Sequence, residues 1–162
     1  MKKGQATMRE IGLAALIMIV LILYLYFTAP QLPEPAQFKE KCFLKENFTC
    51  RYVFLRRGSS RLELILEQNT GSTVNITSLV CTKRSQTPIM TPLNNSILIT
   101  SGERAYISGG NSGNEVVCTE SDGKTAPEGK LGEVYEGYLY MTYLDRLGNV
   151  VFVNGSIATK YS

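Results

Sequence analysis

The four cysteines are the residues of this 162-residue chain whose type and spacing bear most directly on chemistry. A zinc site needs closely spaced ligand pairs such as C-x₂₋₄-C, and this spacing is absent. Four cysteines allow three disulfide pairings, and we favour Cys42–Cys50 with Cys81–Cys118 because each pair flanks one contiguous block. On the loop-entropy model these two closures contribute about 2.6 and 3.9 kcal/mol.

Side chains that commonly carry out catalysis are scarce. The chain has no histidine, which excludes a histidine base, a histidine triad and a histidine metal ligand. The stretches GSSR, SGER and SDGK have turn compositions. A single aspartate, Asp122, in a loop that also carries a lysine provides too few oxygen ligands for calcium. We expect no enzymatic activity, no cofactor and no metal site. A net charge of +3 from scattered basic residues also predicts no binding of nucleic acid.

Four asparagines lie in the Asn-X-Ser/Thr motif for N-glycosylation: Asn47, Asn75, Asn94 and Asn154. One such motif arises easily by chance, whereas four in one domain indicate a glycosylated surface. Asn75 lies in a strand-like run, so its side chain must point outward if it is to be modified.

The N-terminal part of the chain predicts a single long hydrophobic helix. An apolar run without charges extends over residues 11–27, after three basic residues. These seventeen residues would span roughly 26 Å as a helix, the short end for a hydrocarbon core of about 30 Å. The basic residues favour a cytoplasmic N-terminus. We predict a membrane or filament-core helix over residues 5–29, with Ile17 and Leu21 on one packing face.

The remainder predicts a β-rich domain over residues 38–162, joined through a proline-rich linker over residues 30–37. Short runs rich in β-branched and aromatic residues alternate with turn compositions. Within residues 62–67 a leucine stands at every second position, which predicts a half-buried strand. The turn at residues 145–149 predicts a hairpin. The expected fold is an all-β sandwich or barrel, Ig-like and antiparallel, as a head on the long N-terminal helix.

The beginning of the sequence also resembles a known leader. Lys-Lys-Gly-Gln-Ala-Thr-Met, followed by Arg9, an acidic residue and an apolar run, is similar to the class III signal peptides of archaeal type IV pilin-like proteins. KCFLKENFTCRYVF and GEVYEGYLYMTYLDRLGNVVFVNGSIATK resemble the family's Cys-loop-Cys opening and its closing pair of strands. The resemblance implies removal of residues 1–4 by a cut between Gly4 and Gln5, which leaves the helix on the mature protein. The family usually has glutamate fifth after the cut, whereas this chain has Arg9 there and Glu10 sixth, so the glutamate's role is not transferred.

This resemblance implies a structural subunit of an archaeal type IV-like pilus that serves surface adhesion. The implied partners are other copies of the chain, a prepilin peptidase, and an assembly ATPase with its platform. The chain would lie in the membrane before assembly and in a surface filament afterwards. Two other interpretations remain. A cleavable secretory signal is disfavoured by the bulky end YLYFTAP, and a plain signal anchor would hold a monomeric cell-surface binding domain.

Overall fold

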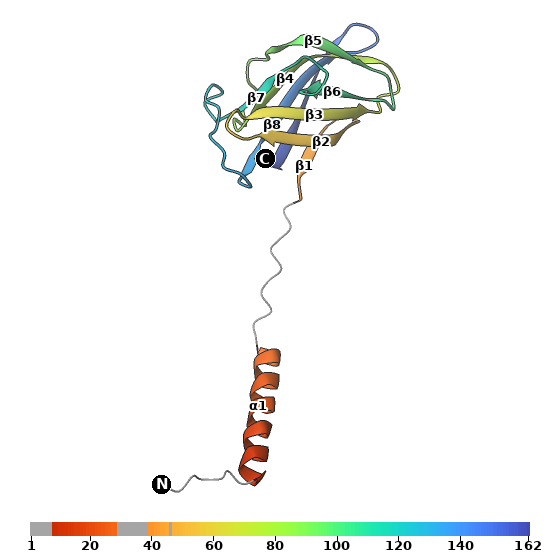
Figure 1. Cartoon of the computed structure of the whole chain (residues 1–162). Helices are drawn as coiled ribbons and strands as arrows, with labels where there is room; N and C mark the ends of the chain where they lie inside the picture. Colours follow the sequence, from red (N-terminus) through yellow and green to blue (C-terminus); the bar gives the residue numbers. More distant parts are fainter. Residues whose placement is uncertain (1–7, 29–38, 46) are drawn as a thin grey trace. The chain divides into compact units, whose positions relative to one another are not determined.

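The computed structural model describes residues 8–28, 39–45 and 47–162. The chain divides into two compact units, Met1–Phe38 and Lys39–Ser162 (Figure 1). The first unit contains helix α1, Met8–Thr28. Its leucine, methionine and alanine residues favour helix, and Pro30 in the following sequence cannot continue one.

The predicted long hydrophobic helix needs correction. Helix α1 comprises 21 residues in the described part of the chain, fewer than the predicted range of residues 5–29. Within residues 8–28, 39–45 and 47–162, no helix has both the length and the apolar character required to cross a membrane.

The second unit is built from β-strands. Their bounds are β1 (Lys41–Leu44), β2 (Phe48–Arg56), β3 (Arg61–Gln68), β4 (Val74–Thr82), β5 (Pro92–Ile99), β6 (Arg104–Ser108), β7 (Val116–Thr119), β8 (Val134–Leu144) and β9 (Val150–Lys160).

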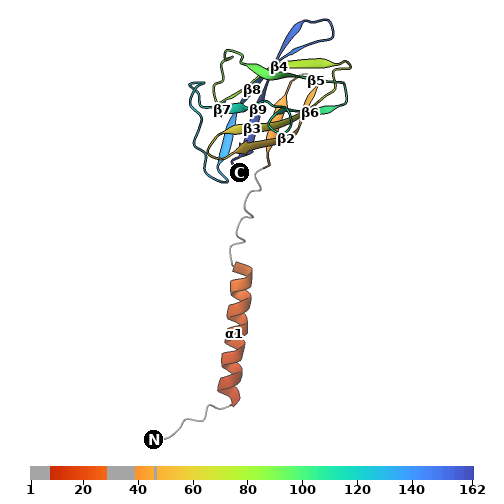
Figure 2. The ribbon, with the colours of Figure 1, turned by 45° about the horizontal axis from the view of Figure 1, so that its top comes forward.

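The strands form one nearly closed, barrel-like sheet (Figure 2). Their order is β1-β9-β8-β4-β7-β3-β2, with β5 paired to β4 and β6 paired to β3. The two end strands approach each other through a disulfide between β1 and β2. The C-terminus adds a bridge between Leu55 and Tyr161, and the backbone N–H of Ser162 donates to the carbonyl of Leu55 at 3.1 Å.

The prediction of an antiparallel, Ig-like head is wrong, because β4 and β7 pair in parallel through Cys81 with Cys118 and Thr82 with Thr119. Parallel neighbours need a long crossover connection, and β5 and β6 supply it here. Hydrophobic alternation has the same period in both kinds of pairing, so the sequence pattern did not reveal the strand direction.

The core lies between the inward faces of the strands. The alternation predicted for residues 62–67 is present, because Leu62, Leu64 and Leu66 are buried. On β8, Leu139 and Met141 also point inward. Each such side chain contributes about 1.5–3 kcal/mol on burial. Further buried apolar residues are Leu55, Ile76, Ile99, Ile107, Val153 and Ile157.

Candidate functional surfaces

Helix α1 presents apolar side chains in all directions. Every residue from 15 to 24 is exposed, and successive side chains on a helix point about 100° apart. The residues predicted to form a packing face, Ile17 and Leu21, are 51% and 49% exposed. Large contiguous apolar surfaces on proteins commonly contact other proteins or membranes.

The leader residues Gly4 and Gln5, where the cut is predicted, lie outside the described residues. The side chain of Glu10 is likewise outside what the structure describes. The cut between Gly4 and Gln5 stays a prediction.

The predicted disulfide pairing is confirmed. Cys42 and Cys50 join β1 to β2 with their Cα atoms 5.7 Å apart. Cys81 and Cys118 join β4 to β7 with their Cα atoms 4.5 Å apart, and both are fully buried. The first bond joins two consecutive strands that stand at opposite ends of the strand order, and the second joins strands whose cysteines are 37 residues apart in the sequence.

The four asparagines of the glycosylation motifs lie in different surroundings. Asn47 is exposed beside the start of β2, and Asn94 is exposed on β5. Asn154 is half-buried on β9. Asn75 lies on β4 between β5 and β8, and its side-chain carbonyl oxygen is buried without a hydrogen-bond partner among the described residues.

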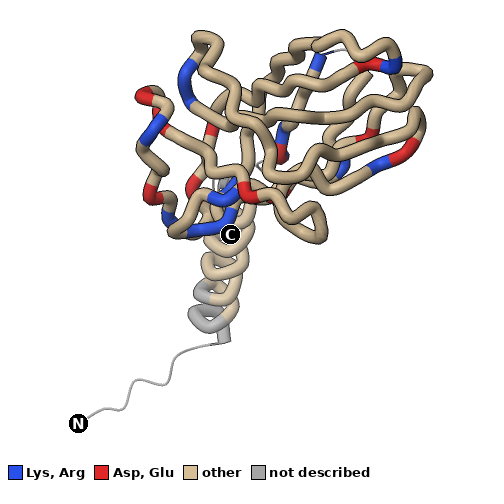
Figure 3. The backbone as a smooth tube through the Cα atoms, turned by 90° about the horizontal axis from the view of Figure 1, so that it is seen from above, with Lys and Arg blue, Asp and Glu red and all other residues tan. Residues whose placement is uncertain are grey.

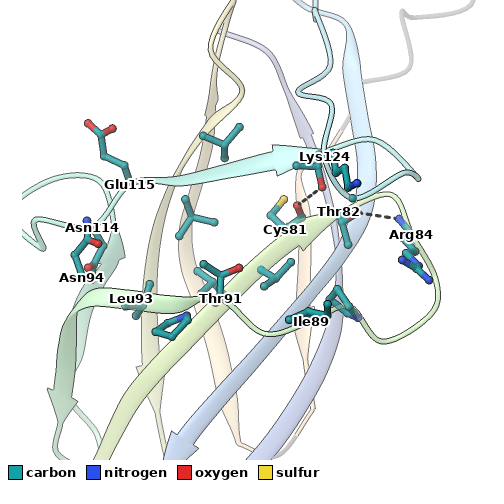
Figure 4. A pocket seen from close by; sticks show the side chains of 18 of the residues that line it. Cys81, Thr82, Arg84, Ile89, Thr91, Leu93, Asn94, Asn114, Glu115 and Lys124 are labelled. Atoms are coloured by element: carbon teal, nitrogen blue, oxygen red, sulfur yellow. Dashed lines mark hydrogen bonds between the residues drawn. The ribbon is translucent and has the colours of Figure 1, made fainter.

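A cleft of about 430 Å³ opens where β4 changes from pairing with β5 to pairing with β7 (Figure 4). Its lining combines apolar side chains such as Leu79 with the charged Arg84 and Lys124. At one end of the view Asn94 and Asn114 lie close together. No three potential metal-binding side chains cluster anywhere in the described ranges of the chain.

Asn114 is a buried residue whose role sequence reasoning missed. Its side-chain oxygen accepts a hydrogen bond from the backbone N–H of Asn95 at 2.8 Å. Its side-chain nitrogen donates to the carbonyls of Asn95 at 2.9 Å and Ile107 at 3.1 Å. The Asn114 side chain thus supplies hydrogen bonds to backbone groups of Asn95 and Ile107 beside the cleft. The surrounding sequence GGNSGN has the composition of a turn and does not reveal this network, because the network depends on tertiary contacts.

The loop at the other end of the cleft is held by Asp122. Its carboxylate accepts hydrogen bonds from the Thr125 hydroxyl and from the backbone N–H groups of Lys124 and Thr125 at 2.9 Å. These bonds, the Thr125 hydroxyl foremost, lower the pKa of Asp122 from 3.8 to about 2. The predicted turn is therefore present, and its carboxylate oxygens are occupied by the turn itself.

Charges of both signs are interspersed over the second unit (Figure 3). Several are paired across strands, including Arg51 with Glu67 at 2.6 Å and Arg56 with Glu63 at 2.8 Å. The hydrogen bond from Arg51 holds the pKa of Glu67 below its usual value. Exposed pairs of this kind contribute about 0–1 kcal/mol each.

The chain matches no model of a known protein family, and it matches no curated protein.

Proposed function

We propose that this chain is a pilin, a structural subunit of an archaeal type IV-like pilus that serves surface adhesion. The exposed apolar surface of α1 carries the proposal. Residues 15–24 of this helix are all exposed. Burial of apolar area contributes about 25 cal/mol per Å², so copies of α1 from neighbouring subunits would form a packed filament core.

The leader-like tip supports the same assignment. A cut between Gly4 and Gln5, before the apolar run, would leave α1 on the mature protein for assembly. The partners we propose are other copies of the chain, a prepilin peptidase, and an assembly ATPase with its platform. The precursor would be at the cell membrane and the mature subunit in a surface filament. Disulfides persist in such an oxidising exterior, and the β-domain carries two.

A second candidate is a cell-surface binding domain that acts as a single copy and is anchored through its N-terminal segment. The cleft between β5 and β7 favours it, because concave sites with mixed apolar and polar lining suit ligands. In this case α1 would contact lipid rather than other copies of itself. The two candidates therefore differ in processing and in self-association.

The N-terminus of the mature protein tests the pilin assignment. N-terminal sequencing of surface protein should show a start at Gln5. Gly4→Leu should block leader removal, whereas Lys2→Arg keeps the basic charge and should be processed normally. A start downstream of Phe27, or an intact Met1 in the mature protein, would contradict the proposal.

A further inference from the structure

The outer face of β8 and β9 carries aromatic side chains around Asn154. Directly opposed residues in a sheet point to the same face. Val153 pairs with Met141, and both are buried in the core. Their neighbours Asn154 and Tyr140, which also pair with each other, must therefore point outward.

Three aromatic rings form a row on this face. Tyr140 lies 6.1 Å from Phe152 and 6.3 Å from Tyr138 between ring centroids. The Tyr140 ring is almost completely covered, and its hydroxyl donates to the carbonyl of Arg84 at 3.0 Å. Tyr140 therefore fixes the row, while Phe152 and Tyr138 each stay 40% exposed. We call these three rings the aromatic row.

Asn154 lies beside the aromatic row, both along β9 and across to β8. Phe152 lies two residues before it on β9 and therefore on the same face. Tyr140 lies directly across from it, and Tyr138 lies across from Ser156. Phe43 of β1, also opposite Ser156, adds another ring that is 64% exposed. The amide of Asn154 therefore lies on the same face as the exposed rings of Phe152 and Tyr138 and is placed to hold a covalent group beside them.

The motif around Asn154 is compatible with modification. Ser156, which completes the motif, is exposed. Gly155 is required by packing, because a Cβ atom there would collide with the backbone of Phe43 and Leu44. A substitution of Ser156 should therefore disturb the strand less than a substitution of Gly155 would.

We propose that Asn154 carries an N-linked oligosaccharide and that its first sugar packs on the exposed ring of Phe152, with Tyr138 beside it. The donor is an oligosaccharide held on a lipid phosphate. The Asn154 amide nitrogen forms the bond to the anomeric carbon, the bond from that carbon to the phosphate oxygen breaks, and the amide loses one proton. The C–H face of a sugar suits the electron-rich face of an aromatic ring.

Two of the other motifs, those of Asn75 and Asn94, lack this combination. The buried side-chain oxygen of Asn75 between two neighbouring strands leaves that amide poorly placed to carry a sugar. Asn94 lines the cleft rather than the aromatic row. The sugar would also cover an aromatic face that otherwise stays open to solvent, which is a liability for association. This inference holds for a filament subunit and for an anchored domain alike.

Glycopeptide mass spectrometry of the full chain, purified from the cells that produce it, tests the modification. We expect a sugar on Asn154 and an unmodified Asn75. Ser156→Ala should abolish the modification at Asn154, whereas Ser156→Thr keeps the motif and should retain it. An unmodified Asn154 in the natural protein would overturn the proposal.

Thermal unfolding tests the packing. The Ser156→Thr protein should melt about 3 °C above the Ser156→Ala protein, the size of shift that one modest contact gives in a domain of this length. In a Phe152→Leu background, with occupancy checked by mass spectrometry, this difference should fall by at least half. An undiminished difference would show that the sugar does not pack on Phe152. Self-association of the natural protein through this face, seen by sedimentation and abolished by Phe152→Leu, would also contradict the proposal.

Discussion

Cys81 of β4 and Cys118 of β7 lie directly opposite each other where the two strands run parallel, and a disulfide joins them. Strand β7 also pairs antiparallel with β3. The bond therefore lies at the junction between the strands grouped around β4 and β8 and those grouped around β3. The hydroxyl of Tyr135 lies 3.8 Å from the Cys81 sulfur and donates a hydrogen bond to the Thr119 carbonyl. The buried Tyr135 ring is part of the core beside this disulfide.

Loss of this disulfide should destabilise the β-domain more than loss of the other one. On the loop-entropy model, the 37-residue separation of Cys81 and Cys118 gives about 3.9 kcal/mol. We expect Cys81→Ala with Cys118→Ala to lower the free energy of unfolding in urea by about that amount. The matched variant, Cys42→Ala with Cys50→Ala, removes the bond between cysteines only eight residues apart. It should lower the free energy of unfolding by about 2.6 kcal/mol. Equal losses, or a larger loss for the matched variant, would contradict this order.

Replacement of Asn114 should destabilise the region beside the cleft. Asn114→Ala removes one partner from the backbone groups of Asn95 and Ile107, and an unsatisfied buried group costs about 1–3 kcal/mol. Urea unfolding should show a loss in this range. Asn111→Ala changes an exposed residue of the same loop and should be nearly neutral. Hydrogen exchange at the amide of Asn95 should accelerate only in the Asn114 variant, and unchanged exchange there would exclude the proposed role.

The local features of the fold could be predicted from the sequence, and the long-range ones only in part. Alternation at Leu62, Leu64 and Leu66 predicted an inward strand face, because side-chain direction has a period of two. The cysteine spacing suggested the correct pairing but not the parallel direction of the strands it joins. Direction depends on where the chain travels between Cys81 and Cys118, and no local pattern records that path.

The candidate surfaces show the same division. The apolar run of the N-terminal segment predicted a packing face at Ile17 and Leu21, and this face stays a prediction because both side chains are exposed on α1. By contrast, the aromatic row became visible only when β8 and β9 were paired, because register decides that Tyr140 faces Asn154. The role of Asn114 was hidden for a related reason. A buried amide acts through partners 19 and 7 residues away, which turn composition does not specify.

The pKa of Asp122 provides a pH test of its loop. Its folded-state pKa, about 2, is below the ordinary value of 3.8, so its contribution to stability is present above pH 4 and is lost as the pH falls toward 2. NMR titration of the carboxyl carbon should give a midpoint near that lowered value. Thr125→Ala should move the midpoint upward, because the Thr125 hydroxyl is the largest cause of the shift. Thr125→Ser keeps a hydroxyl and should leave the midpoint low, so an equal rise in both variants would reject this cause.

Truncation of the α1 packing face separates a filament subunit from an anchored single domain. Ile17→Ala with Leu21→Ala keeps the segment apolar, so lipid would accept the altered shape and the cellular level of the protein should be preserved. In a packed filament core each truncation leaves a cavity that costs about 2–5 kcal/mol, and every subunit would carry both. We therefore expect few or no filaments by electron microscopy.

The control for this experiment exchanges the two side chains. Ile17→Leu with Leu21→Ile conserves the apolar volume, and swaps of this kind usually cost below about 1.5 kcal/mol. This variant should still assemble, although with shorter or fewer filaments. Abundant filaments from the double alanine variant would show that Ile17 and Leu21 are not in a packed core. If the natural protein forms no filaments together with its assembly machinery, the pilin assignment fails and the anchored domain is the function that stands.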